Sequence, residues 1–197
     1  MKSLAIVAAL GAVLLSSGTN STEPVSASGT YEVDGGHSSV VFSTKHLDVS
    51  RFYGRFNEVS GSIDFNEADV TQSRVSIEIP TASVDSNSEQ RDGHLKSPDF
   101  FSAKEFPVIT YESKSITDSA DAFEIQGELT LRGVTKPVTA KAVQVGSGDT
   151  MFGDFRSGFE ARFEIQPADF GFTFMKEKPK AVGPGVEVIV SLECIKQ

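Results

Sequence analysis

The sequence predicts an all-β protein in which about eight strands form an antiparallel sheet that closes into a barrel, with one short helical segment. Apolar residues recur at every second position along most of the chain after residue 30, which is the period of a strand with one buried face. Helical periodicity is weak and short by comparison. Strands with one apolar face each are typical of an antiparallel sheet that curls around a single core.

The alternation locates the strands one after another. The expected inward positions are Val40, Phe42, Thr44 and His46; Phe56, Gly61, Ile63 and Phe65; Val75, Ile77 and Ile79; Ile109 and Tyr111; Phe123, Ile125, Gly127, Leu129 and Leu131; Val138, Ala140 and Ala142; Phe155, Ser157, Phe159, Ala161, Phe163 and Ile165; and Val186, Val188, Val190 and Leu192.

The connections are read from turn residues and from the gaps in this pattern. A bulge or turn is expected near 57–60, and Arg132-Gly133 predicts a tight turn between two strands. Residues 87–95 predict one or two helical turns, while 169–175 could form a strand or a loop over the barrel mouth. No linker-like stretch follows Tyr31, which predicts one domain.

Residues 1–27 are expected to be a signal peptide and residues 28–197 the folded domain. Lys2 precedes an uncharged apolar run, 4–15, which has the length of an export signal and is too short to span a bilayer. Val25-Ser26-Ala27 suits cleavage, and sites near Ser17 or Ser21 are alternatives. We therefore expect a periplasmic or secreted protein.

The composition limits the kinds of partner and covalent link that can be expected. The net charge is −9, and it stays −9 when residues 1–27 are removed, because Lys2 and Glu23 leave together. Such an acidic protein lacks the electrostatic footprint of a nucleic-acid-binding protein, and anionic lipid surfaces would repel it on average. Cys194 is the only cysteine, so no internal disulfide is possible, and its phase with Leu192 places it in the core or at the rim.

Several motifs occur in a consistent order along the chain. They are VDGGHSSVVFSTKHL (33–47), RDGHL (91–95), FPVITYES (106–113), GELTLRGVTKPV (127–138), ADFGF (168–172) and VEVIVSLE (186–193). In this order they resemble the YceI-like family of bacterial secreted proteins, over roughly residues 30 to 193. The resemblance implies a lipocalin-like barrel that holds a long isoprenoid lipid. Ala168 departs from the family, in which a basic residue commonly precedes Asp-Phe-Gly, so no charge contact is expected there.

An eight-stranded barrel is either filled by side chains or leaves room for one slender ligand. Small residues opposite phenylalanine could leave an apolar slot, or the fifteen Phe side chains could fill the interior. The resemblance favours the slot, with a bound polyisoprenoid as the sole cofactor-like group. The expected ligand-binding residues are Phe42, His46, Phe56, Phe65, Ile77, Asp92, His94, Phe100, Phe101, Ile109, Tyr111, Leu129, Leu131, Phe159 and Phe163.

Polar residues at the mouth would fix the lipid's head group, and His46, Asp92, His94 and Lys96 are the candidates. Asp92 and His94 could instead form a hydrogen-bonded cap that holds the short helix on the barrel. A metal site is not expected, because nine strand residues separate His37 from His46 by about 30 Å.

The sequence contains no nucleophile elbow, P-loop or dinucleotide-binding fingerprint, so we expect no enzyme. The first hypothesis is a lipid-binding barrel for transport, storage or stress response. The alternatives are a hydrolase or isomerase acting on a lipid-like substrate, and a closed structural barrel without a ligand. Transient membrane contact and a homodimer are compatible with the first hypothesis, and an exposed edge near Phe170–Phe174 is the candidate dimer face.

Overall fold

The computed structural model describes residues 25–119, 121–174, 178 and 181–197. All but the last three residues of the expected signal peptide lie outside this part of the chain. In the described residues, the strands are β1 (Gly29–Val33), β2 (Ser39–His46), β3 (Ser50–Phe56), β4 (Ser60–Phe65), β5 (Arg74–Pro80), β6 (Val84–Asp85), β7 (Val108–Ser119), β8 (Ala122–Leu131), β9 (Val134–Asp149), β10 (Phe155–Ile165) and β11 (Val182–Lys196). The helices there are α1 (Glu89–Leu95) and the 3₁₀ helices η1 (Val70–Gln72), η2 (Thr81–Ser83) and η3 (Pro167–Phe170).

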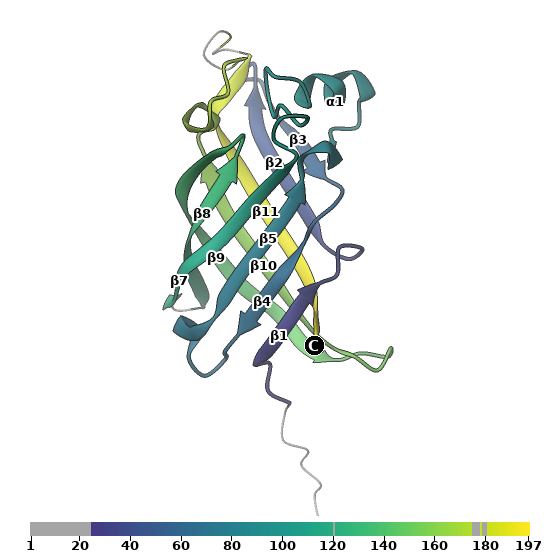
Figure 1. Cartoon of the computed structure of the whole chain (residues 1–197), viewed down its shortest axis with the longest axis vertical. Helices are drawn as coiled ribbons and strands as arrows, with labels where there is room; N and C mark the ends of the chain where they lie inside the picture. Colours follow the sequence, from purple (N-terminus) through teal and green to yellow (C-terminus); the bar gives the residue numbers. More distant parts are fainter. Residues whose placement is uncertain (1–24, 120, 175–177, 179–180) are drawn as a thin grey trace, which may run out of the picture.

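The strands form one antiparallel sheet that closes on itself (Figure 1). β11 pairs with β1 through Cys194–Lys196 and with β2 through Val182–Ser191, so β1 and β2 run one after the other along it. β4 and β3 lie along β1 and β2 in the same manner, and β5 and β6 continue the series. The pairs β1 with β2, β4 with β3, and β5 with β6 therefore act as three long strands, each with one interruption. Together with β7 to β11 they make the predicted closed barrel of eight strands.

The interruptions in the first two long strands face each other. They fall at 34–38 and at 57–59, the second of which lies within the turn expected near 57–60. A Cβ atom at Gly35 would lie 2.7 Å from the carbonyl oxygen of Val59, so this approach requires a glycine. The two breaks therefore lie side by side in neighbouring strands.

The Arg132-Gly133 turn is confirmed between β8 and β9. Both residues have left-handed backbones, with φ of 52° and 69°. This conformation at both central positions matches the right-handed twist of the two strands, which explains the tight hairpin.

β7 and β9 extend further than the apolar pattern indicated. The second half of β7 has a single buried apolar residue, Ile116, and the end of β9 exposes Val145. These parts are strands because they pair with β8 and β10, and not because they cover the core.

α1 lies across one end of the barrel, beside β3 (Figure 1). Ser88 caps the helix by accepting a hydrogen bond from the backbone N–H of Arg91, and Leu95 is its buried residue. The short helix expected within 87–95 is thus confirmed. No helix among the described residues is long and apolar enough to cross a membrane.

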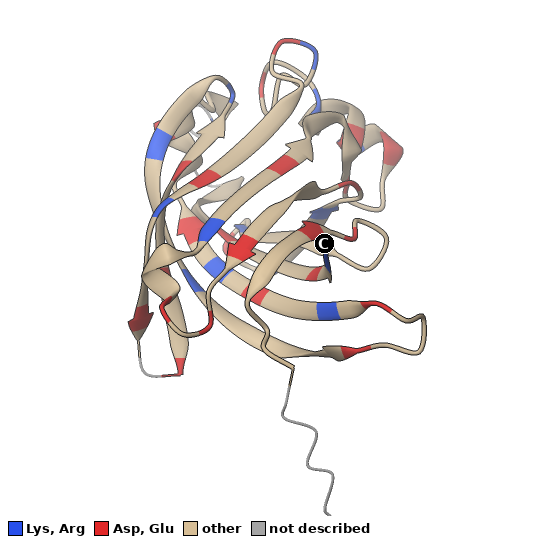
Figure 2. Cartoon of the chain, turned by 60° about the horizontal axis from the view of Figure 1, so that its bottom comes forward, with Lys and Arg blue, Asp and Glu red and all other residues tan. Residues whose placement is uncertain are grey.

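The opposite end is closed by aromatic packing. The rings of Phe65 and Phe159 lie 5.3 Å apart, Phe123 packs 5.9 Å from Phe65, and Tyr31 meets Phe159 edge to face at 6.5 Å. The hydroxyl of Tyr31 is buried and donates a 2.6 Å hydrogen bond to the carbonyl of Ala27. Acidic and basic residues occur on strands and loops all around this barrel (Figure 2).

Candidate functional site

The barrel holds an apolar cavity of about 420 Å³ that extends inward from the end covered by α1. This volume lies within the range of small-molecule sites in proteins. Its walls are the inward side chains of most of the strands, closed at the mouth by α1, by the segment after it and by the loop after η3. The apolar wall residues include Val40, Phe42, Phe56, Ile77, Ile109, Ile125, Leu129, Leu131, Ala140, Ala161, Phe163, Val186, Val188, Val190 and Leu192.

The cavity exists because the aromatic side chains gather at the two ends of the barrel. Phe42, Phe56 and Phe101 pack together toward the mouth, with ring centroids 5.4–6.3 Å apart. Phe65 and Phe159 pack at the closed end. Between the two groups the wall is formed mainly by aliphatic and small side chains, together with Tyr111 and Phe163, whose rings stack 6.5 Å apart.

Two hydroxyl groups within the cavity wall, those of Thr44 and Tyr111, are already bonded to the barrel itself. The hydroxyl of Thr44 donates to the carbonyl of Gly185 at 3.1 Å. The hydroxyl of Tyr111 donates to the carbonyls of Ile125 and Val138 at 3.1 and 3.3 Å, and burial raises the pKa of Tyr111 to about 12. The interior therefore presents an apolar surface to a ligand.

Charged side chains are found at the mouth. The guanidinium carbon of Arg91 lies 4.6 Å from the ring centroid of Phe52, and its Nε donates to Ser86 Oγ at 2.9 Å. The ring of His94 packs edge to face on Phe100 at 4.9 Å. His46, the last residue of β2, and Lys45 before it also line this rim. A ligand with one polar end would thus have its chain inside and its head group at the rim.

All of the expected ligand-binding residues line the cavity except Phe65, Phe159 and Asp92. Phe65 and Phe159 point inward as expected, but they belong to the aromatic group that seals the closed end. The carboxylate of Asp92 accepts hydrogen bonds from the backbone N–H and the hydroxyl of Ser86. It fixes the segment before α1, as in the helix-cap alternative, and Lys96 also lies outside the lining.

Other wall and rim residues were not anticipated. Arg91, Phe52, Phe172 and Phe174 all line the cavity. The "RDGHL" motif contained Arg91, and a helical wheel of 89–95 would have placed it on the same face as His94 and Leu95. Phe172 belongs to an alternating run with Phe170 and Phe174, which suits a strand as well as a loop over the barrel mouth, so the sequence alone did not assign it to the cavity.

The region 167–174 corrects the expectation of an exposed dimer edge. Phe170 and Phe172 are buried, and the ring of Phe172 packs 5.4 Å from Phe101 inside the mouth. η3 and the loop after it therefore cover the core, as in the loop alternative for this segment.

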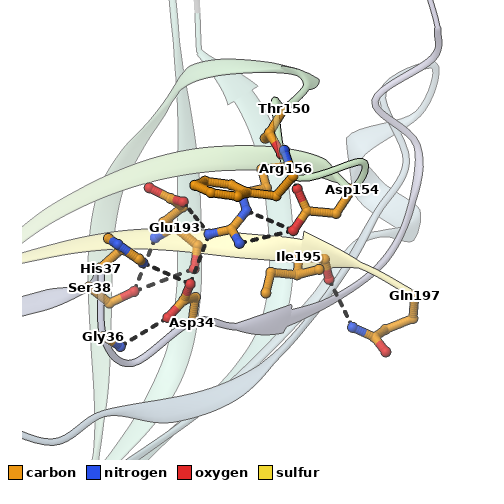
Figure 3. Close-up of polar contacts among 11 residues, drawn as sticks. Asp34, Gly36, His37, Ser38, Thr150, Asp154, Arg156, Glu193, Ile195 and Gln197 are labelled. Atoms are coloured by element: carbon orange, nitrogen blue, oxygen red, sulfur yellow. Dashed lines mark hydrogen bonds and ion pairs between the residues drawn. The ribbon is translucent and has the colours of Figure 1, made fainter.

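A second polar cluster lies at the closed end, where β1, β10 and β11 meet (Figure 3). Ligand-type atoms of Asp34, His37 and Glu193 lie within 4.8 Å of one another. The guanidinium of Arg156 occupies this cluster and bonds Asp34 at 2.8 Å, Glu193 at 2.5 Å and Asp154 at 2.9 Å. Arg156 supplies the positive charge, so the arrangement is that of an ion-pair network that joins strands.

Comparison with known proteins identifies relatives over the whole barrel. The family model described as the YceI-like domain matches residues 31–194. Protein YceI of Salmonella newport is 40% identical over 172 residues, which cover 85% of this chain and 87% of that protein.

Solved structures share the fold. BcnA of Burkholderia cenocepacia superimposes with a TM-score of 0.75 at 22% identity, over 82% of this chain and 98% of that one. A polyisoprenoid binding domain from Saccharophagus degradans, implicated in plant cell wall breakdown, gives 0.61 at 16% identity, over 85% and 98%. From the motif order, the closed barrel and the extent of these matches, the chain belongs to the YceI-like family.

Proposed function

We propose that this protein is an exported lipid-binding protein that holds one polyisoprenoid chain, such as a prenyl or quinone-like lipid, inside the barrel. It would serve transport, storage or a stress response, and it would not be an enzyme. The observation that carries the proposal is an apolar cavity of about 420 Å³ whose charged groups lie only at its mouth, among the residues that line it. The Saccharophagus degradans relative, named as a polyisoprenoid binding domain, supports this choice of ligand.

The cavity suits a chain that binds without polar contacts. Each buried CH₂-sized group contributes about 0.8 kcal/mol, so a long prenyl chain would gain its affinity from the wall alone. Arg91, His46 and His94 would then contact the head group and set the direction in which the lipid enters.

The two alternatives receive less support. A filled structural barrel is at odds with the open space between the aromatic groups. A hydrolase or isomerase was considered because Asp92 and His94 could act as an acid–base pair. In the structure Asp92 bonds Ser86, whereas Nε2 of His94 lies 3.1 Å from Asp99, so the two residues serve different contacts.

Export through a cleaved leader remains part of the proposal, and the contacts of 25–27 bear on the cleavage position. Ala27 is buried, its N–H donates to Glu67 at 3.0 Å, and its carbonyl accepts from Tyr31. Cleavage after Ala27 would remove these contacts, whereas cleavage near Ser17 or Ser21 would keep them. We therefore favour the earlier positions, which N-terminal sequencing of the exported protein would distinguish.

The test fills the cavity. Ala161→Phe places a ring in the cavity from β10, where Ala161 lies opposite Val190 and both belong to the wall. Its matched control is Val143→Phe, on the outer face of the adjacent strand β9. We expect the parent and Val143→Phe proteins to bind a short-chain polyprenyl quinone alike, and Ala161→Phe to lose at least about tenfold in affinity.

Native mass spectrometry of protein from an exporting host, followed by organic extraction, gives an independent measurement. A released polyisoprenoid would support the proposal and identify the head group. Failure of the apo parent protein to bind any added polyprenyl quinone or phenol would reject it. Ala140→Leu, a smaller filling change in the same wall, replaces Ala161→Phe if that variant does not fold.

A further inference from the structure

The turn between β2 and β3 exposes two apolar side chains beside the cavity mouth. Leu47 is 55% exposed and Val49 is 85% exposed. The residues on either side of this turn, His46 and Phe52, line the cavity, and the turn stands at the end of the barrel that carries α1 (Figure 1). The two apolar side chains, with Asp48 between them in the sequence, therefore stand beside the mouth of the cavity.

The backbone of this turn is unfavourable for Leu47, one of the two residues at its centre. Leu47 and Asp48 both have φ of 55°, a left-handed conformation that Gly, Asn and Asp adopt more easily than leucine. The turn is nevertheless well defined, because Val49 N–H donates to the His46 carbonyl at 3.0 Å and Leu47 N–H to the Ala181 carbonyl at 3.2 Å. Neither packing nor turn geometry explains why a leucine is held here facing water.

We propose that this turn is a docking site for the surface of a lipid bilayer, through which the ligand enters and leaves the cavity. The inference rests on the proposed function, since a polyprenyl chain resides in membranes and would cross water if the mouth faced solution. With Leu47 and Val49 inserted, the apolar region of the bilayer and the cavity become contiguous. Two side chains bind weakly and reversibly, which suits a protein that must leave the membrane with its ligand.

Charge indicates the kind of surface. The protein carries a net charge of −9, so an anionic membrane would repel it overall, and a zwitterionic surface is the better partner. Lys45, which is exposed two residues before Leu47, could extend to the head-group layer while the turn inserts.

The molecule provides its own control for this proposal. The turn between β9 and β10 also exposes two apolar residues, Met151 at 92% and Phe152 at 76%. It lies at the other end of the barrel, near the C-terminus, where the aromatic packing closes the interior (Figure 1). Exposure alone would predict that this turn binds a bilayer at least as well, whereas ligand exchange requires the β2–β3 turn.

A single tryptophan reports which end meets the membrane, because the chain has none. Val49→Trp and Met151→Trp are compared on adding vesicles of dioleoylphosphatidylcholine. We expect the emission of the Val49→Trp protein to shift to the blue and to become protected from an aqueous quencher, and that of Met151→Trp to stay unchanged. A shift in Met151→Trp alone, an equal shift in both, or none in either would overturn the proposal.

Removal of the exposed apolar side chains provides a second test of the proposal. Leu47→Asn with Val49→Ser is compared with Met151→Ser combined with Phe152→Ser in flotation with the same vesicles. The Leu47→Asn, Val49→Ser variant is expected to have a membrane partition coefficient about tenfold or more below that of the parent. The Met151→Ser, Phe152→Ser variant should partition nearly as the parent does. Asn tolerates the left-handed backbone at 47, so this variant should fold at least as well as the parent.

Binding of a polyprenyl quinone in detergent solution separates this inference from the proposed function. If Leu47→Asn with Val49→Ser binds the quinone normally but no longer floats, both stand. If the parent binds the quinone but never binds vesicles, only the docking inference fails. If the parent floats with vesicles and the Val49→Trp emission shifts, but the parent binds no quinone, the proposed function fails and a bilayer contact alone remains.

Discussion

Gly54 shows how one residue sets the size of the cavity. It lies on β3 opposite Phe42, and a Cβ atom at this position would overlap the ring of Phe42, a cavity-wall residue. The absence of a side chain at 54 lets that ring lie flat against the strand. The width of the cavity near the mouth therefore depends on a glycine as much as on the phenylalanine.

Gly54→Ala should destabilise the protein by about 1–3 kcal/mol, because the Phe42 ring must move into a packed wall. It should also weaken binding of a polyprenyl quinone by narrowing the cavity. Denaturant titration and ligand titration measure the two effects. Gly146→Ala is the control, since a Cβ there meets nothing within 4 Å, and equal effects of both changes would refute this account.

Cys194 is the other residue whose environment makes a clear prediction. Its side chain is fully buried, and burial raises the pKa of its thiol to about 12. Thiolate is the reactive form, so the folded protein should not react with an aromatic disulfide reagent near pH 8. In denaturant the reaction should be rapid, and fast labelling of the native protein would show that β11 opens locally.

Among the strands, the junction of β1, β10 and β11 depends most on electrostatics. Arg156 is largely buried and bonds carboxylates of Asp34, Asp154 and Glu193, which lie on three different parts of the chain (Figure 3). Ser38 reinforces the junction, since its hydroxyl accepts from the backbone N–H of Glu193 at 3.1 Å. The first strand is thereby fixed to the last ones at the point where it bends.

Arg156→Met should lower the thermal midpoint by several degrees, because it leaves three neighbouring carboxylates without their cation. Arg162→Met is the matched control: Arg162 bonds Glu160 at 2.8 Å on an exposed part of the same strand, and such pairs contribute little. A midpoint for Arg156→Met no lower than that of Arg162→Met would contradict the structural role of the cluster.

The same junction predicts how stability depends on pH. The hydrogen bond from His37, and then Arg156, lower the pKa of Asp34, and Arg156 lowers the pKa of Asp154. A lowered carboxyl pKa adds stability above its unfolded value of 3.8, which is lost as the pH falls through the folded value. Asp34 raises the pKa of His37, which adds a small contribution below the unfolded value of 6.5, lost as the pH rises through the folded value.

Both contributions are therefore complete between these two unfolded pKa values, and the free energy of unfolding should be greatest there. Denaturant titrations from about pH 3 to about pH 8 measure it. In Arg156→Met the loss of stability in acid should be smaller, because protonation then relieves repulsion between the carboxylates. An unchanged acid limb in this variant would show that other groups dominate.

For the molecule as a whole, closure of the barrel is what makes a cavity possible. β1 and β11, from the two ends of the chain, pair with each other, and Gln197 N–H donates to the Thr30 carbonyl at 2.9 Å. A closed sheet has no free edges and keeps its shape without a filled interior. The side chains around the unfilled cavity lack packing contacts, and a bound lipid chain would supply them.

A ligand that binds only the folded barrel should stabilise it. A polyprenyl quinone at a hundred times its dissociation constant should raise the free energy of unfolding by about 2.7 kcal/mol. A thermal melt with and without the quinone shows this as an upward shift of the midpoint, and Ala161→Phe should show none. A shift of the same size in both proteins would indicate binding outside the cavity.

The spacing of residues along the sequence was enough to predict most of the strands and the tight turn between β8 and β9. The alternation of residues such as Phe159, Ala161 and Phe163 depends only on the two-residue period of a strand, and the Arg132-Gly133 turn on backbone preference, so both were predictable. β1 and β6 were missed, because short strands that continue a neighbour's pairing have too few residues for a period to emerge.

The cavity wall depended on contacts between distant parts of the chain. Alternation places Phe65, Phe159 and Phe163 all inward, yet only Phe163 lines the cavity, because the depth of a side chain follows from strand register and barrel tilt. For the same reason Asp92, which was expected at the mouth, lies outside the lining, whereas Arg91, for which no role was expected, lines it. Which of them reaches the mouth depends on how α1 packs beside β3, where Arg91 stacks on Phe52 of that distant strand.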